Sequence, residues 1–249
     1  MDKQIEKCLA SLHSRHIHGI YTANSKDATL KILSLIPQDA VVGIGDSSTI
    51  RQLGLLQRLK ERGIKLLNPF EPEEPQIDSK EAYEYTERVS RQASLCEVFL
   101  TGTNAITQDG RIVNVDAAGN RVAGMFWGHP ISIIIVGRNK VVRNLDEAFD
   151  RIRSIIAPNH SYTKTGESGG RKLKIPCVKT GKCKDCRSPD RVCNIFTIIE
   201  GKPLRTDLNV FIVDEDLGLG WDPSWPEKRI KQIIDNHKKF LWIPKFDIL

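Results

Sequence analysis

Residues 39–63 read DAVVGIGDSSTIRQLGLLQRLKERG, and this stretch decides the class of fold that we expect. A short apolar run at Val41 and Val42 enters a glycine-rich turn, and leucines and isoleucines then recur near helical spacing as far as Gly63. A glycine at that place is typical of the residue that ends a helix. The pattern predicts a strand, a tight turn and a helix, which is the repeating unit of α/β proteins with parallel sheets.

The same alternation continues along the chain. Residues 1–37 predict helical pieces with a break near His18–Gly19. Residues 110–115 and 120–127, joined by DAAG, are typical of a β-hairpin. The other predicted strands are 64–68, 98–100, 131–142, 194–201 and 208–218, and the other predicted helices are 79–95, 144–156 and 226–239. We therefore expect residues 1–249 to form one Rossmann-like, three-layer α/β domain with a mainly parallel sheet, a hairpin and a cysteine-rich insertion at 158–194.

Composition restricts the class of protein further. An apolar fraction of 40% and a charged fraction of 27% are ordinary for a packed globular domain. The longest apolar run, at 131–136, is too short to span a bilayer, and the first twenty residues lack the pattern of a secretory signal. We expect a soluble cytoplasmic protein without a membrane span, whose thiols stay reduced.

Four of the six cysteines lie in CVKTGKCKDCRSPDRVC, residues 177–193. Their spacing is C-x5-C-x2-C-x6-C, and four thiolates that close together suit one metal centre. Both a [4Fe–4S] cluster and Zn²⁺ accept four cysteines, so the count leaves the metal open. The spacing resembles the cluster loop of endonuclease III-type glycosylases, and we favour the cluster with zinc as the alternative. The expected ligands are Cys177, Cys183, Cys186 and Cys193.

The formal net charge of +6 is a local feature. Residues 171–191 hold eight basic and two acidic side chains, a difference of six, so the remainder of the chain is neutral on balance. Four thiolates around Zn²⁺ or an oxidised cluster leave a charge of about −2, which these basic groups would screen. Residues 163–194 contain no aromatic side chain for stacking on bases. We therefore expect no nucleic-acid partner.

Two further groups of polar residues follow predicted strands. In GIGDSST, Gly45, Ser47 and Thr49 suit a phosphate or carboxylate at the start of a helix, although a plain turn needs the same residues. In TGTNAIT and NVDAAGNRV, the candidate ligand-binding residues are Thr103, Asn104, Asn114, Asp116, Asn120 and Arg121. Tight turns alone also use Asn, Asp and Gly, so both interpretations stay open here.

GIGDSSTIRQLG, FLTGTNAITQDGRIVNVDAAGNRVAGM, IIIVGRNKVV and the cysteine motif together resemble the LUD-domain proteins, the lactate-utilisation family, over about residues 20–225. The cysteine motif is that of one branch of this family. The resemblance implies the fold of sugar-phosphate isomerases and CoA transferases, with a pocket at the strand ends. It also implies a small anionic organic ligand and iron–sulfur oxidoreductase subunits as partners, and it leaves the oligomeric state open.

The resemblance assigns no catalytic residues, but side-chain chemistry suggests roles if the ligand is a small hydroxy- or keto-acid. Arg121 and Lys140 would hold a carboxylate, Asp116 would be the base, and Asn104 and Asn120 would orient the ligand. Asp116 and Lys140 are thus the catalytic candidates. Asp46 stands where the family turn has a glycine, and its carboxylate would repel an anion.

Three functions are compatible with these features. The first is a component of an iron–sulfur system that oxidises L-lactate or a related small acid. The second is a free-standing enzyme acting on a phosphorylated sugar, a CoA ester or a folate-like ligand, which rests on the fold alone. The third is a binding module whose cluster senses redox state.

Overall fold

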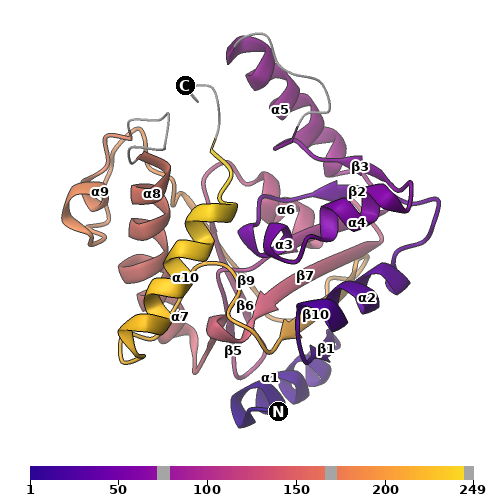
Figure 1. The fold of residues 1–249 in the computed structure, drawn as a ribbon, viewed down its shortest axis with the longest axis horizontal. Helices are drawn as coiled ribbons and strands as arrows, with labels where there is room; N and C mark the ends of the chain where they lie inside the picture. The colour runs from indigo at the N-terminus through magenta and orange to yellow at the C-terminus, as the bar shows by residue number, and fades with distance from the viewer. Residues whose placement is uncertain (72–78, 166–172, 244–249) are drawn as a thin grey trace.

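A six-stranded sheet forms the centre of the computed structural model, which describes residues 1–71, 79–165 and 173–243 (Figure 1). Its strands run in the order β1-β10-β7-β4-β2-β3, and every neighbouring pair is parallel. The strands are β1 (His18–Thr22), β2 (Val41–Ile44), β3 (Lys65–Leu67), β4 (Val98–Gly102), β7 (Ile131–Gly137) and β10 (Asp207–Val213). The expected mainly parallel α/β architecture is confirmed.

Both faces of this sheet are covered, as the apolar run of β7 shows. Ile133 and Ile135 pack with α2, α3 and α4 on one face, while Ile134 and Val136 pack with α1 and α6 on the other. Successive side chains of a strand point to opposite faces, so a strand buried on both sides is apolar throughout. The helices here are α1 (Lys3–Ser14), α2 (Ser25–Leu35), α3 (Ser48–Gln52), α4 (Leu55–Glu61), α5 (Ser79–Ala93) and α6 (Asn120–Phe126).

A second, four-stranded sheet lies against the face of the first that carries α1 and α6. Its order is β8-β5-β6-β9, with β8 (Val141–Val142), β5 (Ala105–Thr107), β6 (Ile112–Asp116) and β9 (Ile195–Ile199). Ile112 faces the large sheet, whereas Val113 and Val115 pack against the helical run α7 (Leu145–Arg151), η2 (Ile152–Ile156) and the C-terminal helix α10 (Glu227–Phe240). The predicted strand 131–142 thus divides at the 3-10 turn η1 (Arg138–Lys140) between the two sheets.

Two predictions for the first third of the chain need correction. The break expected near His18 is the edge strand β1, which pairs with β10. The single helix expected up to Gly63 consists of α3 and α4, interrupted at Gly54, whose φ of 64° is left-handed. Gly63 does follow the end of α4 with a φ of 73°, as a helix-terminating glycine should.

The hairpin predicted from residues 110–115 and 120–127 is wrong in its second half. Residues 120–126 form α6, which buries Val122 and Met125, three residues apart, against the large sheet. The apolar content of NRVAGMFW suits a strand, but its spacing also fits a helix, and burial decides between them. The hairpin lies one element earlier, between β5 and β6, around a turn with Gly110 at a φ of 83°.

The cysteine segment follows a long continuous helix that consists of α7, η2 and α8. The run α7–η2 continues into α8 (Ala157–Thr165), so the expected insertion 158–194 begins within a helix. The wider π-helical turn η2 comes just before Pro158, which lacks the N–H that a regular helix needs. Residues 166–172, with two of the basic side chains, lie outside the described residues. The short helix α9 (Pro176–Thr180) then packs on α8, at the left of Figure 1.

No helix within residues 1–71, 79–165 and 173–243 is long and apolar enough to cross a membrane.

Gly43 in β2 permits the close approach of the end of α5, and this contact predicts the effect of a substitution. A Cβ at Gly43 would lie 2.4 Å from the carbonyl oxygen of Ala93 and 2.7 Å from the sulfur of Cys96. We expect Gly43→Ala to lower the free energy of unfolding by about 1–3 kcal/mol, since the backbone must move. Urea denaturation measures this change. Gly201→Ala, whose Cβ would meet nothing closer than 3.6 Å, is the control, and equal stability of the two variants contradicts the packing.

Candidate functional site

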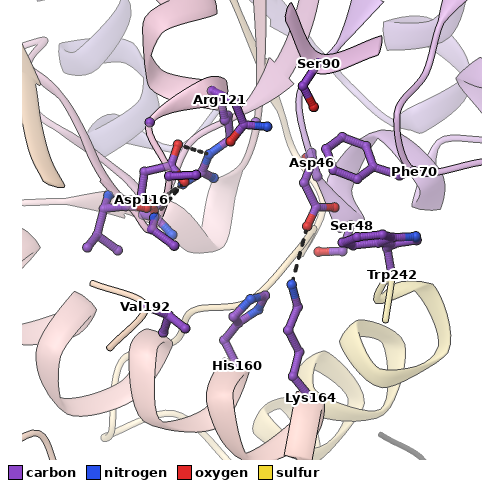
Figure 2. A pocket seen from close by; sticks show the side chains of 18 of the residues that line it. Asp46, Ser48, Phe70, Ser90, Asp116, Arg121, His160, Lys164, Val192 and Trp242 are labelled. Atoms are coloured by element: carbon purple, nitrogen blue, oxygen red, sulfur yellow. Dashed lines mark hydrogen bonds and ion pairs between the residues drawn. The ribbon is translucent and has the colours of Figure 1, made fainter. Parts of the chain in front are cut away.

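A pocket of about 720 Å³ lies at the carboxyl ends of β2, β4 and β7, where a ligand is expected in an open parallel sheet. The turn after β2 and the first turn of α6 form two of its walls. Helix α8 forms another wall, from which His160 and Lys164 extend toward Asp46, with Asp116 and Arg121 opposite (Figure 2). Phe70 and Trp242 add an aromatic side.

Lys140 lines this pocket as a buried lysine, with 5% of its surface exposed. It follows β7 in η1, and its Nζ donates to the carbonyl oxygen of Thr103 at 2.9 Å and to the hydroxyl of Thr49 at 3.1 Å. Burial, assisted by the charge of Arg121, lowers the pKa of Lys140 to about 7. At neutral pH a substantial share of this amine is therefore uncharged.

Arg121 and Asp116 form a second polar group, on α6 and at the end of β6. The guanidinium of Arg121 donates to Asn104 Oδ1 at 3.2 Å and lies 3.7 Å from the carboxylate of Asp116. That carboxylate also accepts the backbone N–H groups of Ala117 and Val122 at 2.9 and 3.1 Å. Asp116 thus holds the first turn of α6 and positions Arg121, while its role as a base stays a prediction.

The carboxylate of Asp46 is neutralised by its neighbours. Arg51 Nη1 lies 2.9 Å from one oxygen and Lys164 Nζ 3.7 Å from the other. Burial raises the pKa of Asp46, but the charges of Arg51 and Lys164 outweigh burial and bring the pKa down to about 2. The repulsion of an anion that the sequence led us to expect is therefore offset by two cations.

Two histidines complete the pocket, and sequence reasoning missed both. His237 of α10 lies with Nδ1 3.2 Å from the hydroxyl of Ser48, and its ring centroid is 5.6 Å from that of His160. Burial, together with the charges of nearby lysines, lowers the pKa of His237 to about 4. Burial and the charge of Lys164 also lower the pKa of His160 well below its usual value. Both rings are neutral at pH 7. No motif surrounds either histidine, because each reaches the pocket only through the packing of its helix.

Seven of the ten predicted pocket residues line the pocket. They are Ser47, Thr103, Asn104, Asp116, Asn120, Arg121 and Lys140.

The other three support that wall from behind. Gly45 lies so close to β4 that a Cβ would meet a side chain of that strand at 2.8 Å. Thr49 accepts the hydrogen bond from Lys140, and Asn114, fully buried, accepts the backbone N–H of Asn104 at 3.1 Å. These residues shape the pocket without lining it.

All four clustered cysteines line one small cavity beneath α8. Burial raises the pKa of Cys177, and the proximity of Cys186, Cys193 and Cys183 raises it further. The spacing in sequence therefore does bring the four thiols together. Cys8 and Cys96, in contrast, are buried elsewhere in the core, as expected of structural thiols.

The loop that carries these cysteines is held by Arg191. Its guanidinium donates to the carbonyl oxygens of Cys186 and Cys193 and to the carboxylate of Asp185, the last at 2.9 Å. Asp185 has a left-handed φ of 46°, and its N–H points to the sulfur of Cys183 at 3.4 Å. Hydrogen bonds of this kind orient and tune thiolate ligands in metal sites.

A buried hydroxyl also lines the cysteine cavity. Ser161 of α8 is fully buried, and its Oγ is without a hydrogen-bond partner among the described residues. Within those residues, no three or more His, Cys, Asp or Glu side chains form a group that could hold a single metal ion. Thiols are the donors that iron–sulfur clusters use, but the described side chains are not arranged around a single ion, and the metal stays a prediction.

The cysteine cavity and the large pocket share a wall. Ala157, Val192 and Cys193 line both. Helix α8 separates them, with His160 and Lys164 in the pocket and Ser161 in the cysteine cavity. A ligand in the pocket would therefore lie next to whatever the cysteines hold.

A parallel sheet with a polar pocket at its carboxyl edge places the chain among Rossmann-like α/β proteins. Residues 5–213 match the family model described as LUD domain, so the chain belongs to the LUD-domain family of lactate-utilisation-type proteins. A solved structure, that of a DUF162 family protein from Deinococcus radiodurans, aligns with a TM-score of 0.45 and 14% identity over 84% of this chain and 94% of that chain. No curated protein matches the chain.

The pairing of Asp46 predicts a pH-dependent contribution to stability. Its pKa is lowered from 3.8 to about 2, so the contribution is complete above pH 4 to 5 and is lost as pH falls through about 2. We expect Asp46→Asn to lower the free energy of unfolding by about 2 kcal/mol at pH 7, with a smaller difference from the wild type below pH 4. Urea unfolding between pH 3 and 7 measures it.

Asp235→Asn is the matched control, since Asp235 pairs with Lys231 on the exposed face of α10. It should change stability by no more than about 0.5 kcal/mol. A difference between wild type and Asp46→Asn that stays constant down to pH 3 would contradict the assignment.

Proposed function

We propose that this LUD-domain protein is a component of an iron–sulfur system that oxidises L-lactate or a related small organic acid. The pocket would bind the acid as its anion, and Cys177, Cys183, Cys186 and Cys193 would hold a [4Fe–4S] cluster. The observation that carries the proposal is the wall of Ala157, Val192 and Cys193 that the pocket and the cysteine cavity share. A redox centre next to a bound acid is what such a system needs.

The charges of the pocket support an anionic ligand. Arg121 and Lys140 line it; Arg121 lies 3.7 Å from the carboxylate of Asp116, and Lys140 has no carboxylate within ion-pair distance among the described residues. The planar guanidinium of an arginine matches a carboxylate with two parallel hydrogen bonds. Asn104 already accepts a hydrogen bond from Arg121, so its part would be to orient that guanidinium.

The chemistry of the residues around the cysteines supports the proposed cluster. Such a group supplies one-electron redox capacity when bound. The chain would contribute four thiolates, the hydroxyl of Ser161 as a donor to sulfur, and nearby positive charge from Lys184 and Arg191, which also line the cavity. Zn²⁺ on the same four ligands is the alternative and would make the loop a structural element.

Metal analysis tests the cysteine site. Protein purified without oxygen should contain about four iron and four sulfide ions per chain and absorb near 400 nm, as cysteine-ligated clusters do. Cys186→Ser should lose most of this iron, whereas Cys96→Ala, which removes a cysteine of the core, should keep it. One zinc per chain would select the alternative, and a folded, metal-free wild type would contradict both.

Calorimetry tests the pocket. Lactate or pyruvate titrated into the protein should release or absorb heat, and Arg121→Ala should weaken binding by roughly 10- to 100-fold, the effect of losing a charged hydrogen bond of about 1.5–3 kcal/mol. Arg58→Ala, at an exposed position of α4, is the control and should bind like the wild type. Identical titrations for wild type and Arg121→Ala would remove the carboxylate site.

A second function is favoured by the size of the pocket. A lactate ion would fill only a small part of 720 Å³, and pockets of about 300–1,000 Å³ typically hold drug-sized ligands. Phe70 and Trp242 would suit a larger ligand with an apolar part. A free-standing enzyme acting on a phosphorylated sugar, a CoA ester or a folate-like molecule fits this volume. Thermal-shift measurements with the three ligand classes test it, and no stabilisation by any would remove it.

A further inference from the structure

Lys140 is a buried amine that lacks the partner a buried ammonium needs. Its two hydrogen-bond acceptors, the carbonyl of Thr103 and the hydroxyl of Thr49, are uncharged. No carboxylate of the described residues lies within ion-pair distance of its Nζ. Burying an unpaired charge is costly, so such a lysine releases its proton more readily than one at the surface. The uncharged form is the nucleophile.

Gly218 leaves space for the amine of Lys140, and the hydrogen bonds of the neighbouring Asn139 fix the position of the turn that carries it. Gly218, with a left-handed φ of 67°, passes so close that a Cβ would lie 2.5 Å from Lys140 Nζ and 2.6 Å from Thr49 Oγ1. The preceding residue, Asn139, is fully buried, and its side chain bonds the backbone of Leu217 and Gly220 at 2.9 and 2.8 Å. These two hydrogen bonds attach η1 to the segment 217–220 and so position the amine of Lys140 at the pocket wall.

The electrostatic environment acts in the same direction. Desolvation disfavours the charged form of Lys140, and the charge of Arg121 adds to this effect, so the pKa is lowered from 10.5 to about 7. Lysines that act as nucleophiles on carbonyl groups are activated by burial or by a neighbouring cation, and Lys140 has both. An amine that served only to clamp a carboxylate would gain nothing from losing its charge.

We propose that Lys140 is a nucleophile that forms an imine with the keto group of a 2-oxo acid bound in the pocket. The proposal rests on the proposed function, since a 2-oxo acid is what the oxidation of a 2-hydroxy acid yields. Arg121 would hold the carboxylate of the ligand, while Thr49 and Thr103 orient the amine.

The step involves no change of oxidation state. The lone pair of Lys140 Nζ forms a bond to the keto carbon, the C=O π pair moves to oxygen, and a proton passes from nitrogen to that oxygen. The resulting carbinolamine takes up a second proton at its oxygen and loses water, which leaves a protonated C=N bond. Hydrolysis reverses each step, so no co-reactant besides water is needed.

Borohydride trapping tests this step. The full-length protein is incubated with pyruvate, reduced with sodium borohydride, and examined by intact mass and peptide mapping. We expect one reduced pyruvyl group per chain, located on Lys140, and none when lactate, which has no carbonyl group, replaces pyruvate. The rate of trapping should fall as pH decreases through about 7, because protonation removes the nucleophile, whereas an exposed lysine needs a pH near 10.

Three variants separate the proposed lysine from its neighbours. Lys140→Arg keeps a positive charge without a nucleophilic amine at pH 7 and should give no adduct. Gly218→Ala should displace the amine and reduce trapping at least tenfold, a readout that remains if Lys140→Arg fails to fold. Lys65→Arg, at an exposed position of β3, should be trapped like the wild type.

The outcomes distinguish this inference from the proposed function. Absence of an adduct on wild-type Lys140 overturns the inference. If pyruvate still produces heat in calorimetry, the carboxylate site survives; if neither heat nor adduct is found, both proposals fail. Adducts spread over surface lysines, or an adduct that persists in Lys140→Arg, also overturn it.

Discussion

The parallel alignment of six strands is the constraint on which the site depends. Because both faces of the sheet are buried, the strands themselves are apolar, and polar residues are placed where strands end. Parallel strands bring these ends to one edge, so the turn after β2, Thr103 after β4 and Lys140 after β7 meet although they are far apart in sequence. The parallel direction of the strands determines where the pocket lies, and the residues that follow each strand determine its chemistry.

Helix α8 joins two parts of the molecule that differ in chemistry. Its His160 and Lys164 belong to the pocket, whereas Ser161 faces the four cysteines, so one short helix is the partition between them. Adjacent residues of a helix point in directions about 100° apart, which is why two cavities can share it. Because of this arrangement, the cysteine cavity lies directly against the pocket and shares part of its wall.

Much of the site was predictable because polar residues that directly follow an apolar strand are visible as a pattern in the sequence. Ser47, Thr103, Asn104, Arg121 and Lys140 stand in polar stretches directly after apolar runs or beside tight turns. The two pocket histidines were not predictable, since they come from helices whose sequences show no motif around them. The neutralisation of Asp46 was not predictable either, because it depends on Lys164, which follows it by more than a hundred residues.

From local pattern alone, the α/β class, the strand and turn that begin at Val41 and the clustering of four cysteines beside one cavity could be predicted, because each rests on residues close in sequence. The helical state of residues 120–126 depends on long-range packing, since their apolar pattern suits either element and burial of Val122 and Met125 against the sheet selects the helix. The position of the cysteine cavity against the pocket also depends on tertiary packing alone. That adjacency arises from the packing of α8 between distant segments, and no local spacing encodes it.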